Sequence, residues 1–209
     1  MKKIVIFVIF SHLLLISINQ TLAGKLSVTS GDSKTATNFK YKKAYFAGGC
    51  FWCMEESFDK INGVVKSVSG YSGGHLKNPT YEDVIYKDTG HVETIEVTYD
   101  PKKISYERLL DIFLKNIDPF DKYGQFCDKG KSYRSVIFFK GKKQQNMIKK
   151  TIIEVENRFD SKVATLLWEF DKFYEAEQYH QDYYQKNFLR YLAYKKACQR
   201  EEVLNKIWN

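Results

Sequence analysis

The sequence predicts one α+β domain, in which a mixed or antiparallel sheet is covered by helices. Three observations predict it: short β-type stretches alternate with amphipathic helical stretches, no internal repeat is present, and no low-complexity break follows Lys43. The 209 residues are 44% hydrophobic, which is enough to bury one core of ordinary size. The 15 Tyr, 15 Phe and only 3 Pro argue against a disordered or fibrous chain.

The first elements alternate between strand and helix around glycine turns. In chain order we expect a strand over 43–47, a helix over 51–59, a strand over 64–69, a glycine loop over 70–74 and a short helix over 80–85. Phe51, Met54 and Phe58 recur at helical spacing, which predicts the first helix. Asn78-Pro79 predicts the start of the short helix, because proline is favoured in the first turn.

The later elements follow the same alternation. In chain order we expect a strand over 91–99, a helix over 106–115, a strand over 136–139, a helix over 144–157, a strand over 164–170 and a helix beginning near Glu175. Residues 91–99 alternate in polarity until Asp100-Pro101 stops the strand. Ser105 is expected to cap the helix that follows it. This order predicts a ferredoxin-like α/β roll, with the single domain spanning residues 41–209.

The N-terminal segment has the pattern of a signal peptide. Lys2 and Lys3 precede an apolar run, and Thr21-Leu22-Ala23 places small residues three apart, as a cleavage site requires. We therefore expect residues 1–23 to be removed and the protein to be exported to the periplasm, with 24–40 as a flexible lead-in. The alternative is an uncleaved segment that anchors the protein to the membrane. After cleavage we expect no stable membrane span.

The formal net charge of +8 raises the question of a nucleic-acid partner. The lysines are scattered, their longest clusters are pairs, and no nucleic-acid-binding signature accompanies them. We therefore expect a solvated basic surface, no nucleic-acid partner, and a monomer.

A cysteine stands where a predicted strand turns into a helix. Gly48-Gly49 allow a tight turn with room for a substrate, and Cys50 follows at the helix start. Unpaired N–H groups and the helix dipole favour negative charge at this position, so we expect them to lower the pKa of the thiol. Cys53 lies three residues later. The pattern indicates a reactive thiol rather than an inert buried cysteine.

The strand over 91–99 carries a carboxylate on its apolar face. Side chains alternate between the faces of a strand, so Glu93 shares a face with Ile95 and Val97, and Glu96 points the other way. Burial raises the pKa of a carboxyl group, which makes Glu93 a candidate general acid at neutral pH. The alternative is that Glu93 lies at the exposed start of the strand.

Several segments together resemble the A-type peptide methionine sulfoxide reductases. The resemblance covers residues 43–190 and rests on an ordered set of matches: 49–52 with Glu55, 70–74, 78–81, 89–93, 118–119, 128–134, His180-Gln181 and Tyr183-Tyr184. It implies that Cys50 attacks the sulfur of a methionine S-sulfoxide while Glu93 protonates its oxygen, which leaves Cys50 as a sulfenic acid. The implied substrates are oxidised proteins, peptides or free methionine sulfoxide.

The resemblance also implies a substrate pocket and a recycling partner. Phe51 and Trp52 match residues that enclose the methyl group of the substrate, and Tyr81, Asp128 and Tyr133 match residues that bind the sulfoxide oxygen. No metal and no organic cofactor are implied, only an external thioredoxin-like thiol reductant.

Three features depart from the family pattern, and the two that involve cysteines concern recycling. Cys53 stands where many members have glycine, Ser132 replaces a frequent glutamine, and a charged, helical ending with Cys198 replaces the glycine-rich tail. The cysteine that resolves the sulfenic acid is therefore open between Cys53, which is favoured by proximity, Cys198 and Cys127.

Three other protein classes share part of this pattern. A thiol–disulfide oxidoreductase is the strongest rival, because 50–53 has C-x-x-C spacing, but the thioredoxin pattern with its later proline-led strand is not evident. A zinc site lacks a second ligand pair at a recognisable spacing. A binding module without catalysis does not account for a poised thiol beside a buried acid.

Overall fold

A six-stranded mixed sheet runs through residues 41–209, the part of the chain that the computed structural model describes. The strand order is β7-β6-β1-β3-β2-β8, with every neighbouring pair antiparallel except β6 and β7. The strands are β1 Lys42–Gly48, β2 Val64–Ser72, β3 Val92–Tyr99, β6 Ser135–Phe139, β7 Leu166–Glu169 and β8 Phe173–Glu175. A separate hairpin is formed by β4 Gly124–Gln125 and β5 Asp128–Lys129. The predicted α+β fold with a mixed sheet is confirmed.

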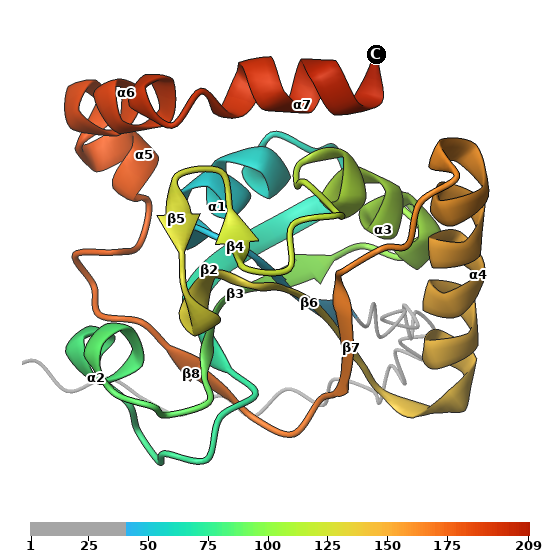
Figure 1. Cartoon of the computed structure of the whole chain (residues 1–209). Helices are drawn as coiled ribbons and strands as arrows, with labels where there is room; N and C mark the ends of the chain where they lie inside the picture. The colour runs from blue at the N-terminus through green and yellow to red at the C-terminus, as the bar shows by residue number, and fades with distance from the viewer. Residues whose placement is uncertain (1–40) are drawn as a thin grey trace, which may run out of the picture. The chain divides into compact units, whose positions relative to one another are not determined.

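Helices cover this sheet (Figure 1). They are α1 Phe51–Asp59, α2 Tyr81–Tyr86, α3 Tyr106–Lys115, α4 Gly141–Phe159, α5 Tyr183–Lys186, α6 Phe188–Ala197 and α7 Arg200–Trp208, with a 3-10 turn, η1, over Lys131–Tyr133. The main core joins α1, α3 and α4 to β1 and β3 through Phe46, Phe58, Ile95, Phe113 and Ile148. A smaller cluster on Tyr45 and Phe138 packs against Trp168, Phe170 and Phe173.

Local signals account for the helices that position the site. Ser105 caps α3 by accepting a hydrogen bond from the Arg108 N–H, as predicted. Thr80 and Asp83 form a capping box at the start of α2. The spacing of Phe51, Met54 and Phe58 buries one face of α1, and the predicted bounds of this helix are confirmed.

Two predicted segments differ in the structure. The helix expected from Glu175 is wrong: Phe173–Glu175 is strand β8, which pairs with β2 at the edge of the sheet. Tertiary pairing outweighs local helical preference here, because Phe173 packs on Tyr45 with 5.8 Å between ring centroids. The glycine loop over 70–74 also begins later than expected, because Gly70, Tyr71 and Ser72 extend β2.

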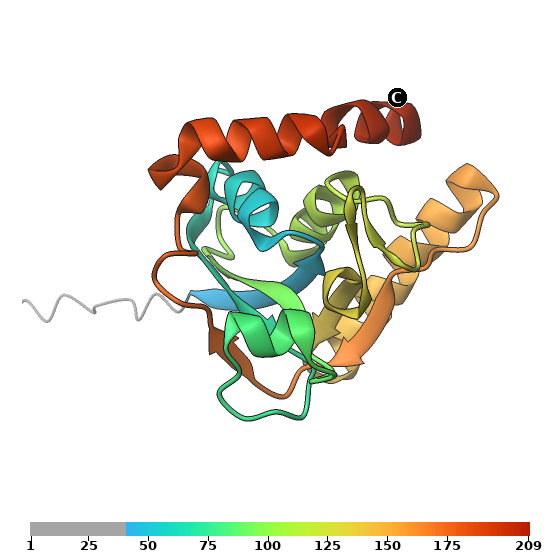
Figure 2. The ribbon, with the colours of Figure 1, turned by 60° about the vertical axis from the view of Figure 1, so that its left-hand side comes forward.

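The C-terminal helices lie on the same side of the sheet as α1. Figures 1 and 2, which view the ribbon from two directions, show α6 and α7 crossing above α1. Tyr183 and Tyr191 of α5 and α6 share a buried cluster with Cys50 and Cys53. The charged, helical ending expected from the sequence is therefore present and packs over the turn that carries Cys50.

The predictions for residues 1–40, namely a signal peptide over 1–23 and a flexible lead-in over 24–40, lie outside the described residues. Among residues 41–209, no helix combines the length and the apolar character needed to cross a membrane.

Candidate active site

The turn between β1 and α1 depends on two glycines. Gly49 has φ of +75°, and a Cβ there would lie 2.5 Å from Cβ of Gln125. A Cβ on Gly48 would lie 2.6 Å from Sδ of Met54. Both the backbone conformation and the close packing therefore require glycine at position 49, and the tight turn predicted from the sequence is confirmed.

We expect Gly49→Ala to destabilise the protein by about 2–4 kcal/mol, since it combines left-handed backbone strain with overpacking against Gln125. Gly141→Ala is the matched control: Gly141 has the same φ of +75° but no atom within 4 Å of an added Cβ. It should cost only about 1–2 kcal/mol. Urea denaturation of both variants measures the difference, and equal losses would show that packing at Gly49 contributes nothing.

Cys50 and Cys53 are both free thiols and both buried. Burial raises the pKa of Cys50 well above its ordinary value, and hydrogen bonding to Cys53 adds to the rise. The hydrogen bond with Cys50 and the nearby Arg200 guanidinium lower the pKa of Cys53 to about 6. The lowered pKa expected for Cys50 is therefore wrong for this closed arrangement, in which burial outweighs the helix dipole and the paired thiols place the negative charge on Cys53.

Glu93 lies on β3 directly beside the start of α1. Its side chain is only 3% exposed, and its Oε2 accepts a hydrogen bond from the Phe51 N–H at 2.9 Å. Burial raises the pKa of Glu93 well above its ordinary value, although the Phe51 hydrogen bond opposes this effect. The burial predicted for Glu93 is confirmed, and the alternative of an exposed strand start is wrong. A carboxyl group with a raised pKa thus faces the residue that follows Cys50.

Two tyrosines complete the polar wall near Glu93. The hydroxyl groups of Tyr81 and Tyr133 lie close enough to influence each other's ionisation. Burial and the Glu93 carboxyl raise the pKa of Tyr81 to about 12, and the same two causes raise the pKa of Tyr133. Both hydroxyl groups therefore stay protonated and available as donors near neutral pH. Asp128 lies close enough to both Glu93 and Tyr133 to influence their ionisation.

Aromatic rings form the apolar wall. Phe51 is fully buried beside Tyr71, and Trp52 stacks on Tyr183 with 3.7 Å between ring centroids. The Trp52 indole N–H donates to Nδ1 of His180 at 3.1 Å. The structure thus brings the predicted pocket residues into one region: Phe51, Trp52, Tyr81, Asp128 and Tyr133 around Cys50 and Glu93.

A supporting layer comes from the segment after β8. The Glu177 carboxylate accepts from the Tyr71 hydroxyl and the Tyr81 N–H, both at 2.9 Å. Gln181 bonds both the N–H and the carbonyl of Ser69, so its amide continues the sheet edge where β8 ends. Burial lowers the pKa of His180 to about 4, which keeps its ring neutral beside Trp52. Glu177 belongs to no motif found in the sequence, and its role follows only from the tertiary contacts.

Three carboxylates gather where the second half of α1 meets the start of α5. Their oxygens, in Glu55, Asp59 and Asp182, lie within 4.8 Å of one another. Glu55 accepts from the Asp182 N–H at 3.1 Å, and Asp59 accepts from the Tyr184 hydroxyl at 3.1 Å. Burial raises the pKa of Glu55 to about 7. These contacts tie α5 to α1, so the cluster is accounted for as support for the C-terminal segment.

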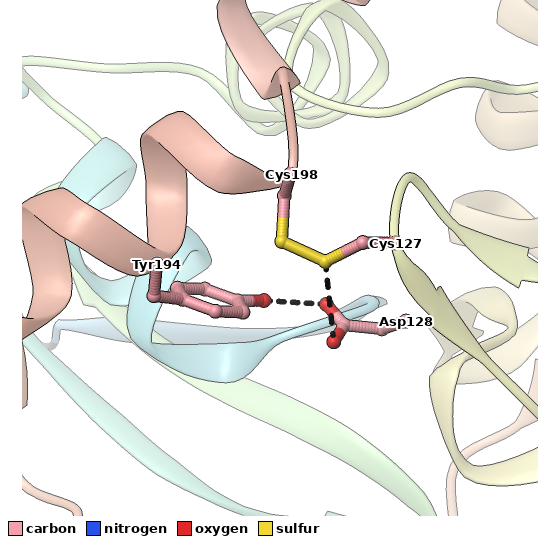
Figure 3. The surroundings of a disulfide bond; sticks show 4 residues. All are labelled: Cys127, Asp128, Tyr194 and Cys198. Carbon is pink, nitrogen blue, oxygen red and sulfur yellow. Dashed lines mark hydrogen bonds between the residues drawn. A yellow bond between two sulfur atoms is a disulfide. The ribbon is translucent and has the colours of Figure 1, made fainter.

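The remaining two cysteines are bonded to each other. The Cys127–Cys198 disulfide joins residues 71 apart in the sequence, with 5.0 Å between their Cα atoms. Cys127 immediately precedes Asp128, whose carboxylate accepts a hydrogen bond from the Tyr194 hydroxyl (Figure 3). Two of the three predicted recycling candidates are therefore occupied by one another, and only Cys53 is free beside Cys50.

The comparisons with known proteins agree with this site. The family model for peptide methionine sulfoxide reductase matches residues 42–209. Peptide methionine sulfoxide reductase MsrA 2 of Staphylococcus aureus is 45% identical over 167 residues, which are 79% of this chain and 94% of that protein. MsrA of Listeria innocua is 42% identical over 174 residues, which are 82% of this chain and 98% of that protein.

A longer relative and two solved structures extend the match. The chain is 45% identical to the MsrA/MsrB protein of Vibrio cholerae over 175 residues, 83% of this chain but only 46% of that protein's length. Reduced Mxr1 of Saccharomyces cerevisiae superposes with a TM-score of 0.67 at 33% identity, covering 71% of this chain and 86% of that one. Methionine sulfoxide reductase A of Corynebacterium diphtheriae gives 0.64 at 28% identity, covering 70% and 75%.

This chain belongs to the peptide methionine sulfoxide reductase family. Its relatives place it among the A-type enzymes, as the motifs in the sequence predicted.

Proposed function

We propose that this enzyme reduces methionine S-sulfoxide, free or within proteins, through Cys50 and Glu93. The observation that carries the proposal is the 2.9 Å hydrogen bond from the Phe51 N–H to Oε2 of Glu93. It holds a buried carboxyl group beside the start of the helix where Cys50 stands. A nucleophile and a proton donor at one point are what reduction of a sulfoxide requires.

In the first step the Cys50 thiol passes its proton to the Cys53 thiolate as the Cys50 sulfur attacks the sulfoxide sulfur, and Glu93 gives its proton to the sulfoxide oxygen. The methionine sulfur gains two electrons and loses its oxygen, and the Cys50 sulfur loses two electrons and becomes a sulfenic acid. Phe51 and Trp52 enclose the substrate methyl group, and Tyr81, Tyr133 and Asp128 bind the sulfoxide oxygen. These two walls differ in polarity, so they orient the methyl group and the oxygen about the sulfur. The resemblance to the A-type enzymes assigns the S epimer to this pocket.

In the second step the Cys53 sulfur attacks the Cys50 sulfenic acid and forms a disulfide, the sulfenic hydroxyl leaves as water with the proton of the Cys53 thiol, and Glu93 regains its proton from solvent. Two observations support Cys53: it is free beside Cys50, and the Arg200 guanidinium helps to lower its pKa to about 6. A thioredoxin-like dithiol then reduces the disulfide. Cys198 and Cys127 are the alternatives, and they become available only after their own disulfide is reduced.

Peptide mapping after one turnover without reductant tests both steps. We expect one equivalent of methionine per enzyme and a Cys50–Cys53 disulfide as the new bond, with Cys127–Cys198 unchanged. The Cys53→Ser variant should still release one methionine but accumulate the sulfenic acid. A Cys50–Cys198 or Cys50–Cys127 peptide, with Cys53→Ser fully active in turnover, would assign the resolving role elsewhere. No methionine from the wild type would contradict the proposed function.

A further inference from the structure

The site described above is closed to substrate. The Cys50 side chain is 5% exposed and the Glu93 side chain 3% exposed. A sulfoxide sulfur has to reach bonding distance of the Cys50 sulfur, and such burial leaves no surface for that approach. Some group that covers Cys50 therefore has to move before the reaction.

The covering group is Tyr194 on α6. Its ring packs against the buried cluster that contains Cys50, and its hydroxyl donates to the Asp128 carboxylate. Its ring meets Trp52 edge-on, with 6.0 Å between centroids. Cys50, Trp52 and Asp128 are groups that the proposed function assigns to the substrate. Tyr194 thus presents a polar oxygen and an apolar ring where the sulfoxide would present its oxygen and methyl group.

A disulfide fixes Tyr194 in this position. Cys198 follows Tyr194 by one helical turn, and its N–H donates to the Tyr194 carbonyl at 3.0 Å. Its partner, Cys127, is the residue before Asp128, and the Cys127 sulfur lies 3.8 Å from Oδ1 of that carboxylate. Figure 3 shows the hydrogen bond between Tyr194 and Asp128 running beside the disulfide. The covalent bond therefore ties together the two segments that this hydrogen bond also joins.

We propose that the Cys127–Cys198 disulfide is a redox latch, which holds Tyr194 in the substrate pocket until a dithiol reductant breaks it. This proposal rests on the proposed function, since it takes the groups under Tyr194 to be the substrate site. With the disulfide formed, Tyr194 stays at a high effective concentration beside Asp128, so substrate competes poorly. With the disulfide broken, the end of α6 is free to move away from Asp128. The sulfoxide then displaces Tyr194 from the pocket more readily.

The reduction is an ordinary thiol–disulfide exchange. A thiolate of the reductant attacks one sulfur of the pair and forms a mixed disulfide with it. The second thiol of the reductant then attacks this mixed disulfide, which frees the protein cysteine. The reductant becomes a disulfide, and Cys127 and Cys198 gain two electrons and two protons. The bond is accessible to such a partner, because Cys127 is exposed and Cys198 partly exposed. Leu189 and Leu192 are exposed on the outer face of α6, so that face does not resist movement of the helix.

Two measurements on the same samples test the latch. Enzyme with Cys127–Cys198 formed and two free thiols is compared with fully reduced enzyme and with a Cys127→Ser/Cys198→Ser double variant, all freed of reductant. The rate of Cys50 alkylation by iodoacetamide is measured by peptide mapping, and methionine release is measured in a single turnover. We expect both rates to be at least tenfold higher in the reduced enzyme and in the double variant.

Tyr194→Ala should give the same increase while the disulfide remains intact. Tyr123→Ala is the matched control, because Tyr123 is exposed and precedes Cys127 on the same hairpin. It should leave both rates unchanged. Equal Cys50 alkylation in latched and reduced enzyme, or slower alkylation in Tyr194→Ala, would overturn the latch. Faster alkylation without any methionine would instead support the latch as a gate over Cys50 and contradict the proposed reductase chemistry.

Discussion

Cys50→Ser should reduce methionine formation from a methionine S-sulfoxide peptide to less than about one per cent of wild type, with any reductant. A serine hydroxyl is a far weaker nucleophile toward sulfur and cannot form a sulfenic acid. Cys50 precedes the first residue of α1 and belongs to the cluster lined by Trp52, Tyr183 and Tyr194. No other free thiol occupies that position, since Cys53 lies one turn further along the helix.

Cys53→Ser is the matched control for this prediction. The substitution removes the neighbouring thiol from the same helix, and Cys53 forms a bond only in the second step of the proposed reaction. In a single turnover it should therefore release about as much methionine as the wild type. Steady-state turnover by Cys50→Ser above the one per cent level would show that another residue attacks the sulfoxide.

Glu93→Gln should slow sulfoxide reduction by about a hundredfold or more, which is the usual scale for a lost general acid. Glutamine has the same shape, and its carbonyl oxygen can still accept the Phe51 N–H that Glu93 accepts at 2.9 Å. The start of α1 and alkylation of Cys50 should therefore survive the change. Single-turnover rates of methionine release, measured on reduced enzyme, check the prediction.

The pH dependence of the reduction rate should show whether the proton of Glu93 matters or only the shape of its side chain. Burial raises the pKa of Glu93 well above its ordinary value, so the carboxyl group keeps its proton to a higher pH than a free glutamate does and loses it as the pH rises further. The wild-type rate should fall as the pH rises through this pKa, whereas the Gln variant has no proton to lose and should lack that fall. Glu96→Gln is the control on the same strand, because Glu96 faces the other way and pairs with Lys43 at 2.7 Å. A near wild-type rate for Glu93→Gln would make Glu93 a structural residue.

The part of the site that could be predicted is the part with local signals. Gly49 and Cys50 indicate a turn and the start of a helix within a few residues, and Ser105 indicates the start of α3. Glu93 could be placed on the same face as Ile95 and Val97 because a strand alternates its side chains, and β3 is one of the two central strands, where that face is buried.

The rest depends on contacts between distant segments. Strand β8 forms because it pairs with β2, more than 100 residues earlier, so the helical preference after Glu175 was misleading. Tyr194 is one of 15 tyrosines, and nothing in its neighbourhood marks it as the residue that covers Cys50. The disulfide crosses 71 residues, and four cysteines allow three pairings that spacing alone does not separate. The pKa of Cys50 is raised because residues distant in the sequence bury its thiol, and the pattern at the helix start does not indicate that burial.

The claim that Cys50 takes the oxidation from the substrate is tested most directly by trapping its sulfenic acid. Reduced Cys53→Ser enzyme is mixed with one equivalent of a methionine S-sulfoxide peptide and with dimedone, and the labelled residue is located by peptide mapping. The account predicts dimedone on Cys50, in an amount equal to the methionine released, and no reaction with the R epimer. Methionine released without a label on Cys50, or a label on another cysteine in its place, would contradict it.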